Sequence, residues 1–415
     1  MPGMHGFTLL FILIVAAGTA LELWLTTRQS AAARAHRDRV PNAFAAQVTP
    51  EAHRKAADYT AAKVRLARTS TVLDALVTLA LTVGGGIAAL DALWLRAGGS
   101  ELWRGTAVIG SVAALVMLVN LPLSLWRTFV LEARFGFNRT TVRLFALDFA
   151  KGVALTLVLG VPVVLAALWL MMRAGAAWWL WAFGGWVALT LLFSWAWPVL
   201  IAPLFNRFSP LADAALKARI EALLARCGFA SSGVFVVDGS RRSAHGNAYF
   251  TGFGRHKRIV FFDTLLEQLA PGEIEAVLAH ELGHFRLHHV RARLAASIVV
   301  MFAAFALLGW LSGQPVFYHA LGVAQPSAHA ALLLFAFAAP AVLYFATPLS
   351  ALWSRRHEYA ADRFAAAHAD ARELAAALVK LYGNNASTLT PDPLYSGFHD
   401  SHPPPLARIA RLTGA

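Results

Sequence analysis

Two histidines four residues apart, with a glutamate directly after the first, are the most informative feature of this chain. They are His280, Glu281 and His284, in the segment His-Glu-Leu-Gly-His. The surrounding stretch, residues 275–290, has helical periodicity. Residues four apart lie on one face of a helix. Both imidazoles could therefore bind one zinc ion, while Glu281 takes a proton from a water on the metal. The pattern predicts metal-assisted hydrolysis of peptide bonds.

A catalytic zinc ion usually has three protein ligands and one open position, so the motif needs a third ligand. One extended form of the motif has glycine and histidine three and six residues after the second histidine. Leu287 and Val290 occupy those positions here, which excludes that form. His288 shares the helix face of His284 but lies about 6 Å further along the axis. We expect His288 and His289 to lie near the ligands or at the surface.

A carboxylate on a second helix is the better candidate for the third ligand. Glu358 and Asp362 are four residues apart in a segment of helical character, so they share one face. Such a pair is more often a solvated face than a ligand pair. Beside the histidine motif, however, we expect Glu358 to bind the zinc ion, one per chain. We expect Asp362 to accept a hydrogen bond from a ligating imidazole and so to fix its tautomer.

The composition places these residues in an integral membrane protein. The chain of 415 residues is 58% hydrophobic and 14% charged, with a mean hydropathy of +0.56. A bilayer core needs about 20 apolar residues in a helix. Seven segments meet this condition: 7–26, 71–95, 106–126, 149–172, 177–205, 294–313 and 329–352. We expect the fifth to kink or end early at Pro198 or Pro203.

The basic residues predict the orientation of the chain. The formal net charge is +13, and Lys and Arg gather in residues 27–70 and 127–143, whereas 314–328 has neither. This alternation puts the N-terminus outside and the C-terminus in the cytoplasm, and it explains the charge without nucleic-acid binding. Two spans separate His284 from Glu358, so both lie on the cytoplasmic side. The richness in Ala, Arg and Gly favours a bacterial source, hence a bacterial inner membrane.

The spans also predict the domains. Residues 1–205 form an N-terminal membrane region with five spans, and 294–353 contain spans six and seven. Residues 206–293 form a cytoplasmic metalloprotease domain, and 354–415 form a C-terminal cytoplasmic segment with the third ligand. Within the metalloprotease domain we expect a helix over 212–227 and strands around 234–237, 248–253 and 258–262. Glu22 and Asp91 fall in or near predicted spans, where they either face a partner or reach water at the interface.

These motifs resemble the type I CAAX prenyl endopeptidases, a family of membrane-embedded zinc metalloproteases. The resemblance rests on Ser354, Arg355, Glu358, Tyr359, Ala361 and Asp362 around the third ligand. Upstream, the segments 132–141, 201–206, 238–240, 247–252 and 258–265 are similar to family segments in family order, and the tail 399–404 completes the match.

The resemblance implies a mainly α integral membrane protein with seven transmembrane helices around a water-filled chamber. A small α/β zinc-metalloprotease domain of the gluzincin kind would lie on the cytoplasmic side. Asn247 and Ala248 would lie on an edge strand that a substrate peptide extends by β-pairing. His402 would stabilise the oxyanion of the tetrahedral intermediate. Arg408 would hold the tail in place by pairing with an acid.

The sequence therefore predicts a zinc metalloendopeptidase with Glu281 as general base, acting on membrane-associated or prenylated CAAX-type peptides. A bacterium is not expected to make prenylated substrates, which favours membrane-associated peptides, although a greasy chamber could also hold a lipidated one. Two alternatives remain open. One is a membrane transporter or channel with a structural zinc ion, and the other is an inactive peptidase-like adaptor for quality control.

Overall fold

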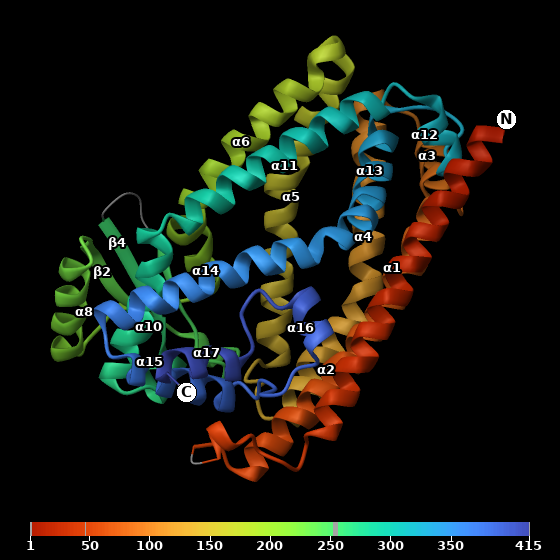
Figure 1. The fold of residues 1–415 in the computed structure, drawn as a ribbon. Helices are drawn as coiled ribbons and strands as arrows, with labels where there is room; N and C mark the ends of the chain where they lie inside the picture. Colours follow the sequence, from red (N-terminus) through yellow and green to blue (C-terminus); the bar gives the residue numbers. More distant parts are fainter. Residues whose placement is uncertain (1, 46, 252–255, 415) are drawn as a thin grey trace.

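The computed structural model describes residues 2–45, 47–251 and 256–414, and it is mainly helical (Figure 1). Six helices in these ranges are long and apolar enough to cross a membrane, or seven if one bent pair counts as a span. The membrane helices are α1 (Pro2–Ala35), α2 (Pro50–Leu81), α3 (Gly86–Ala97), α4 (Glu101–Trp126), α5 (Val142–Arg173), α6 (Trp178–Ala196), α7 (Ala202–Phe205), α11 (His289–Leu311), α13 (Ala328–Leu343) and α14 (Thr347–His368).

The second predicted span, 71–95, corresponds to the bent pair of α2 and α3. Helix α2 ends at Leu81, and α3 begins at Gly86 at an angle of 52°. Three consecutive glycines, Gly84 to Gly86, lie at the bend, and Gly85 has a φ of +77°. Glycine adopts this left-handed conformation without the clash that a side chain would cause.

Other spans are longer than predicted because a π-helical or 3₁₀ turn continues the α-helix at the predicted end. A π-helical turn, Arg127–Glu132, continues α4. A second π-helical turn, Trp197–Ile201, joins α6 to α7 and contains Pro198, so the predicted kink is a local widening of the helix. The 3₁₀ turn Tyr344–Ala346 joins α13 to α14. The last span thus continues beyond residue 352 and carries Glu358 and Asp362 out of the apolar part.

A small mixed sheet forms the compact end of the molecule. Its strands are β1 (Phe208–Pro210), β2 (Ala230–Val237), β3 (Ala248–Thr251) and β4 (His256–Phe262), in the order β1-β2-β4-β3. Strand β2 runs parallel to β4, whereas β1 and β3 pair antiparallel with their neighbours. The sequence did not predict the short strand β1. The last two residues of the predicted strand 248–253 lie outside the described residues. Strand β3 is an edge of the sheet.

Helices pack against this sheet around one apolar core. They include α8 (Ala214–Arg226), α9 (Asp263–Gln268), α10 (Pro271–Arg286) and α15 (Ala371–Asn384). The core contains Ile220, Leu223, Ile259, Phe261 and Leu282, none of which is exposed. The remaining helices are α12 (Pro315–Ala320), α16 (Pro393–His399) and α17 (Pro405–Thr413). This core gives α10, which carries the histidine motif, a rigid support.

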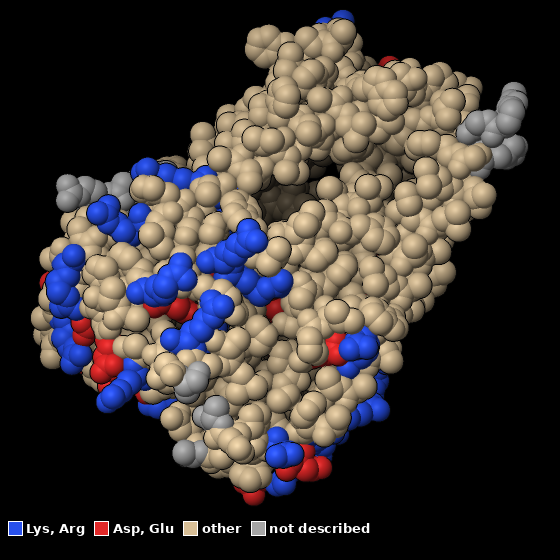
Figure 2. Space-filling view, in the orientation of Figure 1, with Lys and Arg blue, Asp and Glu red and all other residues tan. Residues whose placement is uncertain are grey.

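The long helices surround an open interior. In Figure 1, α11 and α14 run from the compact end towards the far end, and α1 and α2 lie on the side of the molecule away from the sheet. Figure 2 shows a hollow between them bordered by uncharged residues, whereas Lys and Arg gather over the compact end and at the base of the view. Large apolar side chains are exposed on the long helices, among them Leu157, Val158, Trp181, Val299 and Leu349. Such a surface suits a lipid environment.

The ionisable groups in the spans have partners. The carboxylate of Asp91 lies 2.9 Å from Nε2 of His329 and 3.3 Å from Nε of Arg104. Glu22 accepts a hydrogen bond of 2.7 Å from the hydroxyl of Tyr344, and its Oε2 lies 3.0 Å from Nε2 of His399. Of the two expectations for these acids, the partnered one is confirmed.

Candidate metal centre

Helix α10 begins with a cap that also ties it to α15. Pro271 is the first helical residue, where its missing N–H leaves no bond unmade. Two residues on, Glu273 accepts a 2.7 Å hydrogen bond from the backbone N–H of Ala270. The same buried carboxylate lies 2.7 Å from Nζ of Lys380 on α15. These bonds fix the start of the helix that carries His280 and His284.

A glycine between the two histidines lets α10 approach α14 closely. A Cβ atom on Gly283 would lie 3.2 Å from the Cα of Ala361 and 3.1 Å from the Cβ of Phe364. Real side chains rarely approach so closely. The glycine of the motif therefore has a packing role, since it brings Glu358, three residues before Ala361, next to the two imidazoles.

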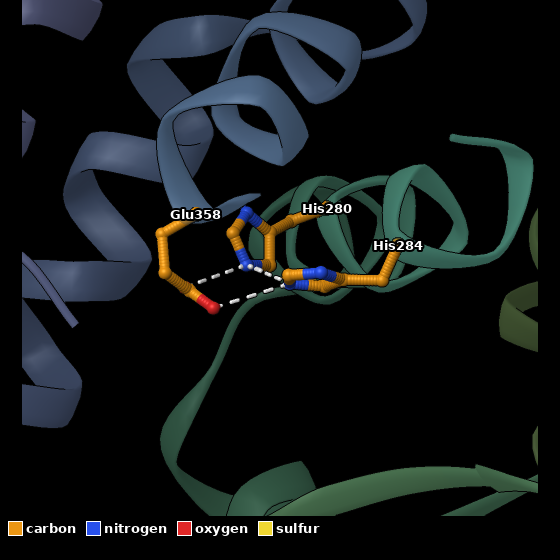
Figure 3. A group of neighbouring side chains, drawn as sticks. All are labelled: His280, His284 and Glu358. Atoms are coloured by element: carbon orange, nitrogen blue, oxygen red, sulfur yellow. Dashed lines mark hydrogen bonds and ion pairs between the residues drawn. The ribbon is translucent and has the colours of Figure 1, made fainter. Parts of the chain in front are cut away.

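Three side chains from these two helices point at one position, as Figure 3 shows. His280 Nε2 lies 3.4 Å from Oε2 of Glu358, and His284 Nε2 lies 3.4 Å from Oε1 of the same carboxylate. The two Nε2 atoms are 3.3 Å apart. His280 and Glu358 are almost fully buried, and His284 is partly buried. The structure thus brings together the three residues that the sequence predicted as ligands.

The other nitrogen of His280 is held by a buried acid. Its Nδ1 lies 2.8 Å from Oδ1 of Asp362. Asp362 accepts two hydrogen bonds from Arg408 on α17, of 2.9 Å from Nε and 2.5 Å from Nη2. Burial disfavours the charged form of His280, but the bonds to Asp362 and Glu358 outweigh it and raise the pKa of His280 to about 9. Asp362 and Arg408 lie where the sequence placed them, next to a ligand and not among the ligand atoms.

His289 supports the second imidazole. Its Nδ1 lies 3.0 Å from Nδ1 of His284, and its ring stacks on that of His357 at 4.0 Å and 8° from parallel. The predicted single helix over 275–290 was wrong, because α10 ends at Arg286 and α11 begins at His289. Between them His288 has a φ of +61°, a left-handed conformation that turns the chain back on itself. His288 itself is exposed.

The donor set suits a small divalent cation such as zinc. Ligand atoms of His280, His284 and Glu358 all lie within 4.8 Å of one another. Oε2 of Glu358 is buried and has no hydrogen-bond partner, which is unfavourable for a carboxylate oxygen unless a cation satisfies it. Both Nδ1 atoms have partners in the protein, so both Nε2 lone pairs are left for a metal. Two imidazoles and one carboxylate are a common catalytic zinc set.

Two further predicted residues lie close to the three-residue set. His402 Nε2 is 3.5 Å from Oε2 of Glu358, and 63% of the His402 side chain is exposed. It lines a cavity of about 470 Å³. Although the side chain is largely exposed, desolvation by the surrounding protein and the positive charges of Arg408 and His280 lower the pKa of His402, and the negative charges of Glu358 and Glu281 oppose this. Glu281 is half-buried on α10, next in the chain to His280.

Asn247 and Ala248 lie at the start of the edge strand. Asn247 is exposed and accepts a hydrogen bond of 2.9 Å at its backbone oxygen from the N–H of Phe262. Its side-chain oxygen accepts a 2.8 Å bond from the N–H of Ala248. Strand β3 pairs with β4 on one side, and β3 ends the sheet on the other. Backbone groups along that outer edge are the groups that an added strand would use.

The sequence pattern alone did not indicate the partner of His289, the role of Lys380 or the packing role of Gly283. The adjacency of His288 and His289 to the motif was visible, but a uniform helix over 275–290 would have turned His289 away from His284. The signal for the break is weak, since Leu287 and His288 are not typical helix terminators. Only the tertiary contacts show which of the two histidines turns back to the site.

Residues 29–207 match a family model described as the CAAX prenyl protease N-terminal region with five membrane helices, and residues 210–415 match peptidase family M48. A CAAX prenyl protease 1 homolog from Oryza sativa is 38% identical, over 76% of this chain and 75% of the relative. One from Caenorhabditis elegans is 32% identical over 97% of both chains.

A solved structure is similar over almost the whole length. The crystal structure of Ste24p from S. mikatae has a TM-score of 0.89 and 31% identity, and it covers 98% of each chain. The similarity therefore extends over the long helices, the compact end and the helix that carries the histidine motif together.

Proposed function

Because the chain belongs to the CAAX prenyl protease family within the M48 metallopeptidases, we propose that it cleaves membrane-associated peptides, including prenylated CAAX-type peptides. Membership of this family makes the chain a membrane zinc metalloendopeptidase. The observation that carries the proposal is the convergence of His280, His284 and Glu358 on one position. We propose that one zinc ion binds there per chain.

The residues around that position have distinct roles in the proposed reaction. When bound, zinc supplies a Lewis acid that acidifies water and polarises the scissile carbonyl. Glu281 takes the proton from the attacking water and returns it to the leaving amine. His402 donates a hydrogen bond to the oxyanion. Asp362, held by Arg408, fixes the tautomer of His280 so that Nε2 faces the metal.

The substrate lies along the edge strand in this proposal. A peptide that pairs with the free edge at Asn247 and Ala248 is held by backbone hydrogen bonds, which are independent of its sequence. Selection then depends on what the chamber admits and on the side-chain pockets. This suits an enzyme whose substrates share a membrane location.

We also propose the domain limits 1–205, 206–293, 294–353 and 354–415, with the N-terminus outside and the site and C-terminus in the cytoplasm. The Lys and Arg side chains gathered over the compact end support this orientation. A bacterial inner membrane is the proposed location. Protease protection of the tail in sealed vesicles of known orientation checks it.

A transporter with structural zinc is not favoured. Structural zinc sites usually have four ligands that include cysteine. Cys227 is the single cysteine of the chain, and it lies in the apolar core with α8. An inactive adaptor is not favoured either, because Glu281 is present between the two histidines.

Cleavage of a fluorogenic peptide in detergent, with and without a chelator, tests the function. The Glu281→Gln variant should bind zinc at the wild-type ratio by elemental analysis but lose at least 100-fold in kcat. Wild-type turnover in a zinc-loaded Glu281→Gln variant would contradict the assigned base. Comparing one peptide with and without a farnesyl group on its cysteine shows whether the lipid contributes to binding.

A further inference from the structure

A second cavity adjoins the one that His402 lines. The second cavity is about 450 Å³, against about 470 Å³ for the first. Lys63 and Ser387 line both, so the two spaces meet at these side chains. A peptide at the zinc position could therefore extend past His402 to Lys63 through these two cavities.

The meeting point of the two cavities carries a net positive charge. The Lys63 ammonium lies over the ring of Tyr59, at 4.2 Å from its centroid. Arg127 also lines the second cavity, and among the described residues neither Lys63 nor Arg127 forms an ion pair within 4.0 Å, although Glu132 attracts both. Arg242, also in the lining, is already paired, at 2.9 Å from Asp148.

The one acid among the described lining residues of the second cavity is itself occupied. Glu132 accepts a 2.6 Å hydrogen bond from the hydroxyl of Tyr59, and its other oxygen lies 3.6 Å from Nε2 of His245. This one negative charge also attracts Lys63 and Arg127, so it faces two cations and leaves a net positive charge. Lys63 and Arg127 remain the groups with capacity for an anion from outside the chain.

The second cavity also lies at the correct end of the edge strand. Ser243 and His245, which line it, directly precede Asn247 and β3. Antiparallel pairing is the more frequent kind. A peptide paired antiparallel with β3 has its C-terminal end beside the start of that strand, so it points towards His245 and on into the second cavity. Three extended residues after the scissile bond span about 10 Å.

We propose that Lys63, together with Arg127, binds the C-terminal carboxylate of the peptide substrate. The site is a subsite for a peptide α-carboxylate, and it would make the enzyme prefer bonds a fixed short distance from a free chain end. The inference rests on the proposed function, because it assumes a peptide along β3. A Lys or Arg donor and a carboxylate form a charge-assisted hydrogen bond, which is stronger than a neutral one.

Binding of a short product peptide tests the subsite without requiring cleavage. An aliphatic tripeptide with a free carboxylate is titrated into the zinc-loaded protein, and the same tripeptide with a C-terminal amide is titrated separately. We expect the free acid to bind at least 10-fold more tightly. Lys63→Met should remove most of this preference by weakening only the acid, and Lys63→Arg should largely retain it. Lys217→Met, at an exposed position on α8, is the matched control.

Cleavage then separates this inference from the proposed function. A longer peptide is assayed as free acid and as amide with wild type, Lys63→Met and Arg127→Met. The subsite predicts a higher KM for the acid in both variants, with kcat and the amide reaction little changed. Equal binding of acid and amide by wild type would overturn the subsite even if both peptides are cleaved. An equal loss for both peptides in Lys63→Met would overturn it too, since it indicates a structural effect. Absence of any chelator-sensitive cleavage would instead contradict the proposed function, and the tripeptide titration would still decide the subsite.

Discussion

The Nδ1 atom of His284 lies 3.0 Å from the Nδ1 atom of His289, the first residue of the next helix. A histidine that binds zinc through Nε2 carries its proton on Nδ1, so His284 donates this bond and His289 accepts it. Loss of such a partner typically lowers metal affinity 10- to 100-fold. We predict that loss for His289→Ala, measured by competition with a zinc chelator. His319→Ala, at an exposed histidine on α12, should not change the affinity.

Gly283→Ala should separate α10 from α14. The added Cβ meets the backbone of Ala361 at 3.2 Å, and backbone cannot rotate away. Overpacking of this kind costs about 1–3 kcal/mol of stability. The melting temperature and the zinc affinity should both fall, because Glu358 moves with α14. Gly383→Ala is the control, since a Cβ there meets nothing within 4 Å. A fully stable Gly283→Ala variant with wild-type zinc affinity would contradict the close-packing argument.

Removal of the Arg408 guanidinium should destabilise the metal centre more than removal of the Arg411 guanidinium, which is on the same helix, α17. Arg408 is buried, and without it Asp362 keeps a buried charge with fewer partners. Breaking a buried ion pair costs about 3–5 kcal/mol. We expect Arg408→Met to lower both the unfolding temperature and the zinc affinity. Arg411→Met, at an exposed position, should have little effect on zinc. Similar results for the two variants would show that Arg408 does not hold Asp362.

Zinc affinity should increase with pH up to about 9. Burial disfavours a charged His280, but Asp362 and Glu358 together raise its pKa to about 9 in the metal-free site. Zinc must displace this proton, so below that pH the apparent affinity should fall by about tenfold per unit. The stability of the metal-free fold depends on pH in the opposite direction. Protonated His280 stabilises that fold fully below about pH 6.5, and this stabilisation is lost as the pH rises through 9. Titration with a zinc indicator at several pH values checks the affinity. In Asp362→Asn the plateau should begin at lower pH.

The sequence predicted the site better than it predicted the helices around it. The spacing of His280 and His284 and the pairing of Glu358 with Asp362 are local features, and helical geometry alone puts each pair on one face. The even number of spans between the pairs allowed them to meet. The three glycines at 84–86 are a local signal that could have predicted the bend. The break at His288 has no such signal, because it depends on the long-range contacts that the chain makes there.

Other residues were beyond the sequence because nothing local marks them. Lys63 reads as one of many basic residues in a charged loop, and only the cavity lining separates it from them. Glu273 reads as an ordinary first-turn acid, whereas it pairs with Lys380, 107 positions later in the chain, and so joins α10 to α15. Such assignments require the relative placement of elements, which periodicity and composition do not contain.

The contact between Arg408 and the metal centre has a consequence for when that centre is completed during synthesis. Arg408 Nη2 lies 3.4 Å from Nδ1 of His280, a residue made 128 positions earlier in the chain. While the protein is inserted into the membrane, both histidines of the motif are present long before the tail that fixes the His280–Asp362 pair. The contact that holds the His280–Asp362 pair in place is therefore among the last parts of the centre to form.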